Sequence, residues 1–276
     1  MKAGLLQLTS SDDPVTNLAT TRDLIAQAVA KGAGFVLTPE VTNCVSQDRA
    51  HQQAVLQSES DDITLAGLRE TARDHEIWLS VGSLALKTND ADGRFANRSF
   101  LINPAGDIVA RYDKIHMFDV DVSETETFRE SAGYRPGACA VVAQTPFASI
   151  GLSICYDLRF AYLHRALAQA GAEVLLVPAA FSPVTGAAHW EPLLRARAIE
   201  TGCYVLASAQ TGQHQVSHGK PRETYGHAMA VSPWGEVLVD MGADTGVAIV
   251  DLDLAEVAKS RKRIPALAHD RSFESP

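Results

Sequence analysis

Three residues whose types can together carry out acyl transfer lie far apart in the sequence: Cys155, Glu40 and Lys114. A cysteine thiolate can attack a carbonyl carbon, a carboxylate can take the thiol proton, and a cation can hold the oxygen of the tetrahedral intermediate. Each residue could also have no catalytic role. Many cysteines are simply buried as small apolar groups, and most glutamates at strand ends are only solvated. A lysine can lay its apolar stem along the protein surface and keep its charged end in water. The pattern gains its meaning only if the fold brings the three side chains together.

Cys155 lies where an apolar run, Ala148–Ile154, gives way to a helical pattern that begins at Tyr156. This change of pattern predicts a strand-to-helix turn at the cysteine. At such a turn the positive end of the helix favours a thiolate over a thiol, and the backbone N–H of Tyr156 can face an oxyanion. A buried structural cysteine is the alternative interpretation.

Glu40 and Lys114 both follow predicted strands. Glu40 comes directly after the strand that ends at Thr38–Pro39, at the carboxyl edge where α/β proteins place functional groups. Lys114 follows a hairpin strand, in the segment Arg111–Asp119, which mixes charged with large apolar side chains. A plain surface strand would alternate between the two kinds instead. The lysine is therefore a candidate for the cation that a thiol and its base require.

The two halves of the chain resemble each other. Each contains an Ala-rich amphipathic stretch, a glycine turn, a short apolar run and a proline, and each contains a Pro-Gly hairpin turn between β-rich runs. The matching segments are Gly32–Pro39 with Gly171–Pro178, Gly4–Leu6 with Gly151–Ser153, and Asn103–Gly106 with Ser232–Gly235. The sequence therefore predicts two pseudo-symmetric halves.

Predicted helices and strands alternate along the chain. Helical patterning covers Val15–Lys31, Leu65–His75, Ala161–Ala170 and Glu191–Gly202, and apolar runs predict strands at Ile77–Val81, Phe147–Cys155 and Tyr204–Ser208. Because buried strands need cover on both faces, two sheets back to back with helices outside them suit both halves. The expected fold is α/β, a four-layer α-β-β-α sandwich, and residues 1–276 are expected to form a single domain because no flexible linker divides them.

Composition excludes several classes of protein. The chain carries 24 Lys+Arg against 33 Asp+Glu, a formal net charge of −9, and it has no Lys/Arg-rich run. Nucleic acid is therefore not an expected partner, because nonspecific nucleic-acid binding depends on cations that neutralise phosphates. A hydrophobic content of 46% also excludes intrinsic disorder.

The sequence indicates neither a membrane protein nor a metal or disulfide framework. No apolar run reaches the ~20 residues that span a bilayer, and the start turns polar at Ser10–Asp13, too early for a signal-peptide core. A soluble, cytoplasmic protein is therefore expected. His214 and His218 have metal-like spacing, but the polar stretch around them is typical of a solvated loop. The four cysteines form no C-x-x-C pair, so no metal ion or disulfide is expected.

Three short segments resemble the nitrilase superfamily of carbon–nitrogen hydrolases: Pro39–Glu40, Lys114–His116 and Cys155–Phe160, in that order. The resemblance runs over nearly the whole chain, from Lys2 to Pro265. It implies the same α-β-β-α sandwich that the internal repeat predicts. It also implies an enzyme that cleaves carbon–nitrogen bonds without a metal or an organic cofactor.

The resemblance implies a role for each member of the family's Glu-Lys-Cys triad, which carries over as Glu40, Lys114 and Cys155. Cys155 would attack the amide carbon, and Lys114 and the N–H of Tyr156 would hold the oxyanion. Glu40 would move the proton, which needs a pKa closer to neutrality than that of a solvated carboxyl, and burial near a second carboxylate would provide it. The family's second glutamate carries over as Glu130, which would position the substrate or water and keep Lys114 charged.

Amides rather than nitriles are the expected substrates, because true nitrilases carry Trp-Glu after the nucleophile and this chain has Tyr156-Asp157. Two related groups, the omega-amidases and the deaminated-glutathione amidases, are similar around the nucleophile and both act on α-keto acid amides. The framework segments Leu193–Val205 and Tyr225–His227 are more similar to the second group. The expected substrate is therefore an α-keto acid amide of the deaminated-glutathione type, and 2-oxoglutaramate or 2-oxosuccinamate is the alternative.

Substrate contacts are expected from residues near the nucleophile and after the second-half strand. Arg159, one helical turn beyond Cys155, can point into the same pocket and hold a substrate carboxylate with its planar fork. A structural ion pair with an acid such as Asp157 is the alternative. By resemblance, Phe181 supplies an apolar wall and Thr185 a hydroxyl contact beside Tyr156.

Three other classes use the same fold or the same thioester. A glutaminase module would be expected beside a synthetase domain, an N-acyltransferase would need a lipid-facing segment, and a non-catalytic binding module would not need the triad. The small-molecule amidase is preferred because all four catalytic positions carry the right residue types. By resemblance the chain is expected to form at least a homodimer, through helix faces and the C-terminal segment Arg263–Ser272.

Overall fold

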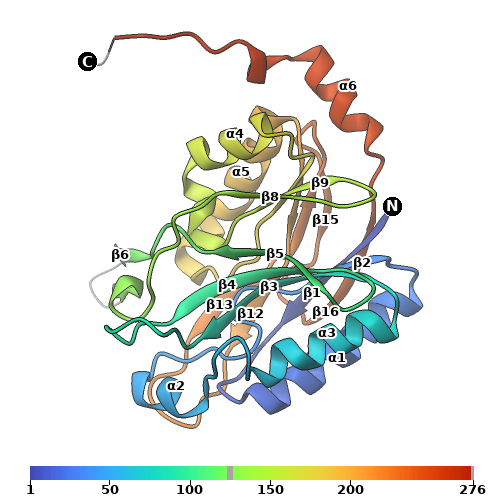
Figure 1. Cartoon of the computed structure of the whole chain (residues 1–276). Helices are drawn as coiled ribbons and strands as arrows, with labels where there is room; N and C mark the ends of the chain where they lie inside the picture. The colour runs from blue at the N-terminus through green and yellow to red at the C-terminus, as the bar shows by residue number, and fades with distance from the viewer. Residues whose placement is uncertain (123–126, 275–276) are drawn as a thin grey trace.

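Two β-sheets lie face to face in the computed structural model, which describes residues 1–122 and 127–274 (Figure 1). Among these residues the larger sheet has eight strands, in the order β13-β12-β1-β2-β3-β4-β5 with β16 also paired to β1. Its strands are β1 (Lys2–Leu8), β2 (Phe35–Leu37), β3 (Trp78–Leu86), β4 (Ala96–Ile102), β5 (Ile108–Asp113), β12 (Ala209–Gln213), β13 (Glu223–Tyr225) and β16 (Gly246–Asp251).

The second sheet has six strands among the described residues, in the order β15-β14-β11-β10-β9-β8. They are β8 (Val141–Gln144), β9 (Ser149–Leu152), β10 (Val174–Leu176), β11 (Tyr204–Ala207), β14 (Met229–Val231) and β15 (Val237–Asp240). A separate hairpin pairs β6 (Asp119–Asp121) with β7 (Thr127–Arg129).

Helices cover the outer faces of both sheets. The α-helices are α1 (Pro14–Ala30), α2 (Arg49–Val55), α3 (Ile63–Asp74), α4 (Ala161–Gln169), α5 (Pro183–Thr201) and α6 (Ala255–Arg263). α1 and α3 pack on the larger sheet, α4 and α5 pack on the smaller one, and α6 projects from the body of the fold (Figure 1). The expected four-layer α-β-β-α sandwich is therefore confirmed. No helix in the described part of the chain is long and apolar enough to cross a membrane.

The strand order repeats between the two sheets, which confirms the predicted pseudo-symmetry. β1, β2 and β3 are parallel neighbours followed by antiparallel β4 and β5, and β9, β10 and β11 are parallel neighbours followed by antiparallel β14 and β15. The predicted hairpin turns Asn103–Gly106 and Ser232–Gly235 join β4 to β5 and β14 to β15. Gly106 and Gly235 adopt the positive φ of 81° and 89° that these turns require.

One helix begins earlier than the sequence predicts. The pattern indicates a helix over Glu191–Gly202, whereas α5 starts at Pro183. The Ser182 side chain accepts a hydrogen bond from the Thr185 backbone N–H, and a proline at the first helical position has the φ that a helix needs. The helix ends at Gly202, whose φ of 61° makes the left-handed cap. Capping therefore brings Thr185 onto the first turn of α5, where it lines the cavity described in the next section.

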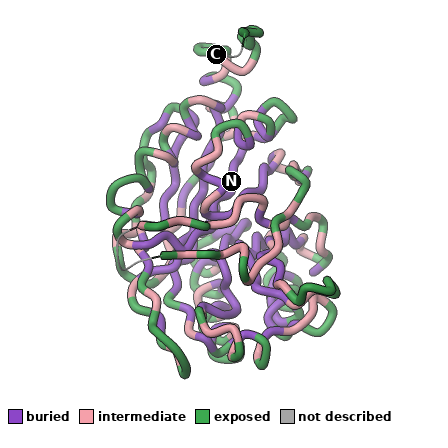
Figure 2. The backbone as a smooth tube through the Cα atoms, turned by 90° about the vertical axis from the view of Figure 1, so that its left-hand side faces the viewer, coloured by how far each residue is buried: buried purple, intermediate pink, exposed green. Residues whose placement is uncertain are grey.

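The space between the sheets is filled by apolar side chains from both of them. Leu5 and Leu37 of the larger sheet belong to the same buried cluster as Leu152, Leu176 and Leu206 of the smaller one. Figure 2 shows this buried interior running through the molecule. Burying a leucine fully contributes about 1.5–3 kcal/mol. The packed layers therefore hold the ends of β2 and β9, and the loops that follow them, in fixed positions.

Candidate active site

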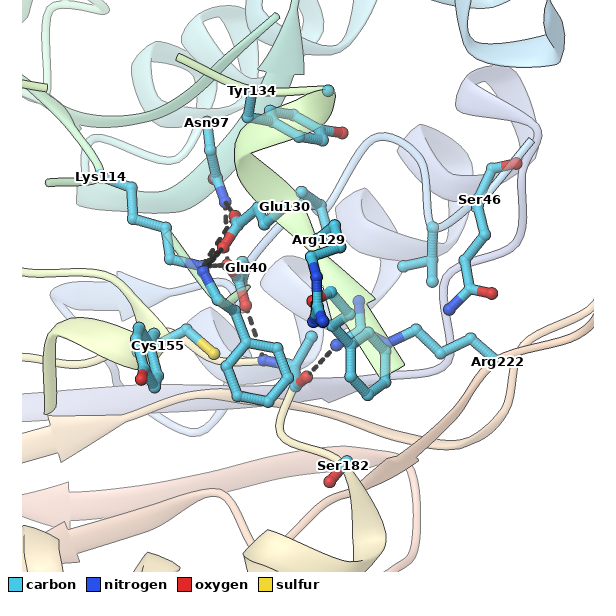
Figure 3. Close-up of a pocket in the computed structure, with 18 of the residues that line it drawn as sticks. Glu40, Ser46, Asn97, Lys114, Arg129, Glu130, Tyr134, Cys155, Ser182 and Arg222 are labelled. Carbon is cyan, nitrogen blue, oxygen red and sulfur yellow. Dashed lines mark hydrogen bonds and ion pairs between the residues drawn. The ribbon is translucent and has the colours of Figure 1, made fainter. Parts of the chain in front are cut away.

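The structure brings Glu40, Lys114 and Cys155 into one pocket. They follow β2, β5 and β9, and the Lys114 Nζ lies 2.9 Å from the Glu40 Oε1. Figure 3 shows the three side chains converging, with the Cys155 sulfur beside Lys114 and Glu40. All three are buried, with exposed fractions of 4%, 2% and 7%. The arrangement holds a nucleophile, a carboxylate and a cation within reach of one substrate atom.

Close packing of β3 against the end of β2 fixes the Glu40 backbone. The Gly82 N–H donates a hydrogen bond to the Thr38 hydroxyl, and the Val41 N–H donates to the Ser83 hydroxyl. A Cβ atom at Gly82 would lie 2.0 Å from the Thr38 carbonyl oxygen, so only glycine fits there. Val41 adopts a positive φ of 46°. This strained turn is held by its neighbours and aims the Glu40 carboxylate into the pocket.

Glu130 lies on the other side of Lys114. The Lys114 Nζ donates to both oxygens of the Glu130 carboxylate, at 2.9 and 2.8 Å, and the Phe118 N–H donates to the Glu130 Oε2 at 2.6 Å. Glu130 begins a short 3₁₀ turn directly after β7. The lysine therefore bridges two carboxylates, the buried one of Glu40 and the half-buried one of Glu130.

Asn97, on β4, is a site residue that the sequence did not reveal. Its Nδ2 donates to the Glu40 Oε1 at 2.9 Å and lies 3.4 Å from the Glu130 Oε1. The Ala180 N–H donates to the second oxygen of Glu40 at 2.9 Å. Glu40 thus accepts hydrogen bonds from Asn97, Ala180 and Lys114, which fix its orientation. An asparagine inside a β-strand was the one available signal, because polar side chains are uncommon at buried strand positions.

Cys155 occupies a strained turn rather than the start of an α-helix. Its φ is +50°, and it begins a five-residue 3₁₀ turn, Cys155–Arg159, before α4 starts at Ala161. The Cys155 N–H donates to the Pro178 carbonyl at 2.9 Å, which ties the turn to the end of β10. The predicted strand-to-helix change is present, but a single 3₁₀ turn has a much smaller dipole than the α-helix that the sequence predicts at this position.

Asp157 holds this turn in place. Its Oδ2 accepts hydrogen bonds from the Ile154 N–H at 2.9 Å and the Tyr112 hydroxyl at 2.6 Å. Its Oδ1 accepts from the His116 N–H at 3.0 Å and contacts the His116 Nδ1 at 2.7 Å. The alternative ion pair between Asp157 and Arg159 is therefore wrong, since Tyr112 and His116 occupy both carboxylate oxygens. Asp157 links the nucleophile's turn to the segment that carries Lys114.

Replacing Asp157 with asparagine is expected to lower the free energy of unfolding by about 2–4 kcal/mol. An asparagine amide has only one oxygen that can accept hydrogen bonds. Its NH₂ group would face N–H or O–H donors that now donate to the second carboxylate oxygen, so those donors would lose their acceptor. Urea denaturation measures the change. Asp23→Asn, at an exposed position on α1, is the matched control and should change stability by less than about 0.5 kcal/mol. Equal stability of the two variants would show that the carboxylate does not hold the turn.

The charges in the site differ from those expected from the sequence. Burial raises the pKa of Glu40, but the charges of Lys114 and Arg222 and the hydrogen bond from Cys155 outweigh it and leave this pKa lowered. Burial and the Glu40 carboxylate raise the pKa of the Cys155 thiol well above its usual value. Burial opposes the charge on Lys114, but Glu130 and Glu40 raise its pKa well above the usual range. The expectation of a Glu40 pKa near neutrality is wrong, because it left out the direct contact with Lys114.

A cavity of about 410 Å³ lies over the triad. The predicted contacts Tyr156, Phe181 and Thr185 line it, together with Glu40, Lys114, Glu130 and Cys155. Its other lining residues are mostly polar or aromatic and include Ser46, Gln52, Asn97, Phe118, Phe128, Tyr134 and Ser182. In the described part of the chain, no group of three or more His, Cys, Asp or Glu residues is arranged to hold a metal ion.

Arg159 is not among the residues that line the cavity. Its guanidinium lies 5.9 Å from the centre of the Tyr156 ring and 5.5 Å from that of Phe181, and its Nη1 is 3.3 Å from the His189 Nδ1. The Arg159 guanidinium therefore lies beside two aromatic rings that line the pocket. The arginines that do line the cavity are Arg49, Arg129 and Arg222.

Comparison with known proteins agrees with this geometry. The sequence profile of the family described as carbon-nitrogen hydrolase matches residues 2–262. The chain is 39% identical over 272 residues to the deaminated glutathione amidase of Yersinia enterocolitica, covering 98% of this chain and 93% of that one.

Two solved structures share the fold. The C. elegans NitFhit protein superposes with a TM-score of 0.88 at 35% identity, covering 98% of this chain, which spans 65% of that protein. A mutant of the amidase from Nesterenkonia sp. AN1, with acrylamide added to its active site cysteine, superposes with a TM-score of 0.77 at 26% identity and covers 96% of this chain and 98% of that one. The family profile, these relatives and the fold together show that the chain belongs to the carbon–nitrogen hydrolase family and is an amidase.

Proposed function

We propose that the chain hydrolyses the amide bond of a small α-keto acid amide, of the deaminated-glutathione type, through a thioester on Cys155. The observation that carries this proposal is the buried contact between Glu40 and Lys114 at 2.9 Å beside the Cys155 thiol. A nucleophile, its base and an oxyanion cation lie together in a pocket of substrate size.

The reaction begins with a neutral thiol and an ionised carboxylate. Glu40 takes the Cys155 proton as the sulfur attacks the amide carbon, and the C–S bond forms while the carbonyl oxygen gains the negative charge. Lys114 and the Tyr156 N–H hold that oxygen. The C–N bond then breaks, Glu40 returns its proton to the leaving amine, and the thioester remains.

Water completes the reaction. Glu40 takes a proton from the water that attacks the thioester, and the proton passes to the Cys155 sulfur as the C–S bond breaks and the acid leaves. Glu130 keeps Lys114 charged through both steps, because its carboxylate accepts two hydrogen bonds from the Lys114 Nζ. The net change is amide plus water to carboxylic acid plus amine.

The size and lining of the cavity support an amide longer than a simple ω-amide. The cavity of about 410 Å³ extends from Cys155 to Ser46, Gln52 and Tyr134, which offer hydroxyl and amide groups. Such groups can hydrogen-bond the peptide-like part of deaminated glutathione. The 39% identical relative in Yersinia enterocolitica bears the name deaminated glutathione amidase.

A comparison of substrates tests the proposal. Deaminated glutathione and 2-oxoglutaramate are offered to the enzyme at equal concentrations, and mass spectrometry follows the released acid and amine. The expected result is at least about a tenfold higher kcat/KM for deaminated glutathione, which corresponds to ~1.4 kcal/mol of additional transition-state binding by the far end of the pocket. A preference for 2-oxoglutaramate would assign the chain to the omega-amides, and no turnover of either would reject the proposal.

We also propose that two copies of the chain pair through α5 and the C-terminal segment. Apolar side chains lie exposed there: Ile199 on α5, Trp234 in the β14–β15 turn and Ile264 after α6. The Arg263 guanidinium stacks on the Trp234 ring at 3.7 Å, which joins the segment to this surface. Light scattering of the purified protein should give twice the mass of one chain, and a monomer would contradict the pairing.

A further inference from the structure

We propose that Arg222 binds a carboxylate of the substrate and makes the enzyme select acidic amides over neutral ones. This inference rests on the amide hydrolysis proposed above and names the residue that would set its specificity. The sequence predicts this role for Arg159, but Arg159 is not among the residues that line the cavity, whereas Arg222 is.

Arg222 reaches the pocket from the loop before β13. Its guanidinium donates a hydrogen bond to the Ala180 carbonyl and lies 5.6 Å from the centre of the Phe128 ring. In Figure 3 the side chain enters from the side opposite Lys114 and Cys155 and points toward them. A substrate between the two sides would therefore meet the thiol at one end and the guanidinium at the other.

Arg222 differs from the other arginines of the pocket in its partners. Arg129 pairs with Asp121 at 2.7 Å, and Arg49 donates to the Gly133 and Gly93 carbonyls at 2.9 and 2.6 Å. Within residues 1–122 and 127–274, no carboxylate lies within 4.0 Å of the Arg222 guanidinium, and its Nε is buried without a hydrogen-bond partner. A buried donor of a charged group is costly to leave unpaired, so this Nε is available for an anion.

The position of Arg222 suits a carboxylate near the reacting bond. The Ala180 carbonyl accepts a hydrogen bond from the Arg222 guanidinium. The Ala180 N–H donates a hydrogen bond to the Glu40 Oε2 at 2.9 Å. One residue of backbone therefore separates the guanidinium from the catalytic carboxylate. The guanidinium is close enough for its charge to lower the pKa of Glu40.

A carboxylate is the anion that this geometry favours. A guanidinium presents several N–H groups in one plane, and two of them can bind both oxygens of a carboxylate. One Arg222 Nη2 hydrogen bond goes to Ala180, which leaves the buried Nε and other N–H groups for the ligand. The Phe128 ring lies on one side of the guanidinium, 5.6 Å away. The carboxylate of an acidic amide loses water when it enters the pocket, and charge-assisted hydrogen bonds from Arg222 would replace that water.

A matched pair of substrates tests this role. Glutaramate, the monoamide of glutaric acid, carries a carboxylate, and glutaramide carries a second amide of nearly the same size in its place. The wild-type enzyme should prefer glutaramate in kcat/KM. Arg222→Gln should raise KM for glutaramate roughly tenfold to a hundredfold and change KM for glutaramide by less than about threefold. Arg222→Lys should recover only part of the loss, because lysine offers a point charge in place of a fork.

The control is Arg129→Gln, which removes the same charge from another arginine beside the cavity. Because Arg129 is already paired with Asp121, this change should alter the glutaramate preference by less than about twofold. Equal losses on both substrates in Arg222→Gln would overturn the proposal and leave Arg222 as a support for Ala180. A similar loss of preference in Arg129→Gln would also overturn it, because general charge and not one guanidinium would then set specificity.

A binding measurement keeps this inference separate from the proposed reaction. Glutarate, which cannot be hydrolysed, is titrated by calorimetry into the wild-type protein and into Arg222→Gln. Tenfold or greater weakening in the variant supports the carboxylate site even if no amide is turned over, whereas equal affinity overturns it. Turnover of amides with unchanged glutarate binding would therefore reject the role of Arg222 and leave the amidase reaction in place.

Discussion

Replacing Cys155 with serine is expected to reduce kcat by on the order of 10⁶, the scale of loss when a hydrolase loses its nucleophile. Glu40 can take a thiol proton because attack, proton transfer and oxyanion binding by Lys114 occur together. A serine hydroxyl is a much weaker acid than a thiol, and a carboxylate with a lowered pKa cannot deprotonate it at a useful rate. Ammonia or amine release under saturating substrate measures the loss.

The fold should survive this replacement. Cys155 is a small side chain, and its N–H bond to Pro178 belongs to the backbone, so it persists in the variant. Cys203→Ser is the matched control, because Cys203 is also buried but lies directly before β11, beside Arg261 of α6, and does not line the cavity. It should keep the turnover of the wild type, with a lower melting temperature. Hydrolysis retained by Cys155→Ser would remove the thioester from the mechanism.

The resemblance to carbon–nitrogen hydrolases predicted that the triad would meet, and local sequence signals placed each member of it beside a strand. Glu40 and Cys155 follow short apolar strands, Lys114 follows a hairpin strand, and turns such as Asn103–Gly106 mark where strands reverse. Turn residues act through their own backbone preferences, so a single sequence carries this information. Because Gly32–Pro39 is repeated as Gly171–Pro178 in the second half, the sequence also predicts that β2 and β10 occupy equivalent positions in the two halves.

The partners of the charged groups could not be anticipated in the same way. Asp157 accepts from Tyr112 and His116, which come from another strand and the loop after it. The direction of the Glu40 pKa depends on contacts with Lys114 and Arg222, which are distant in the sequence. Such contacts depend on how whole elements pack. For this reason the sequence favoured Arg159 as the carboxylate ligand, whereas packing turns it toward aromatic rings.

The resting charges explain why the site needs two glutamates and one lysine. With both carboxylates ionised and Lys114 charged, the three groups sum to one negative charge, and a thiolate would add a second in a buried space. This repulsion and burial keep the Cys155 pKa high. Proton transfer to Glu40 during attack leaves the total unchanged, and the oxyanion then forms next to Lys114. The nucleophile is therefore protected at rest and activated when a substrate carbonyl occupies the pocket.

Lys114→Met tests this account through both rate and stability. Methionine nearly fills the volume of lysine and removes the charge. Loss of one oxyanion donor costs about 10²–10³ in kcat, and the loss of a full cation should reach at least the upper end of that range. Steady-state kinetics at saturating substrate measures it, with Lys31→Met as the control, since Lys31 is exposed at the end of α1.

The pH dependence of stability should change sign in this variant. In the wild type the lowered pKa of Glu40 makes its contribution to the free energy of unfolding complete above about pH 4.3, and the contribution is lost as pH falls through the folded-state pKa. Without Lys114, Glu40 stays buried beside the Glu130 carboxylate without the contacting cation, so the pKa of Glu40 rises above its unfolded value. That proton stabilises the folded variant at low pH and is lost as pH rises through the raised pKa. Urea denaturation at about pH 5 and pH 8 should show the variant losing stability with rising pH relative to the wild type. A constant difference in stability between the two proteins over this range would mean that Lys114 is not what keeps Glu40 ionised.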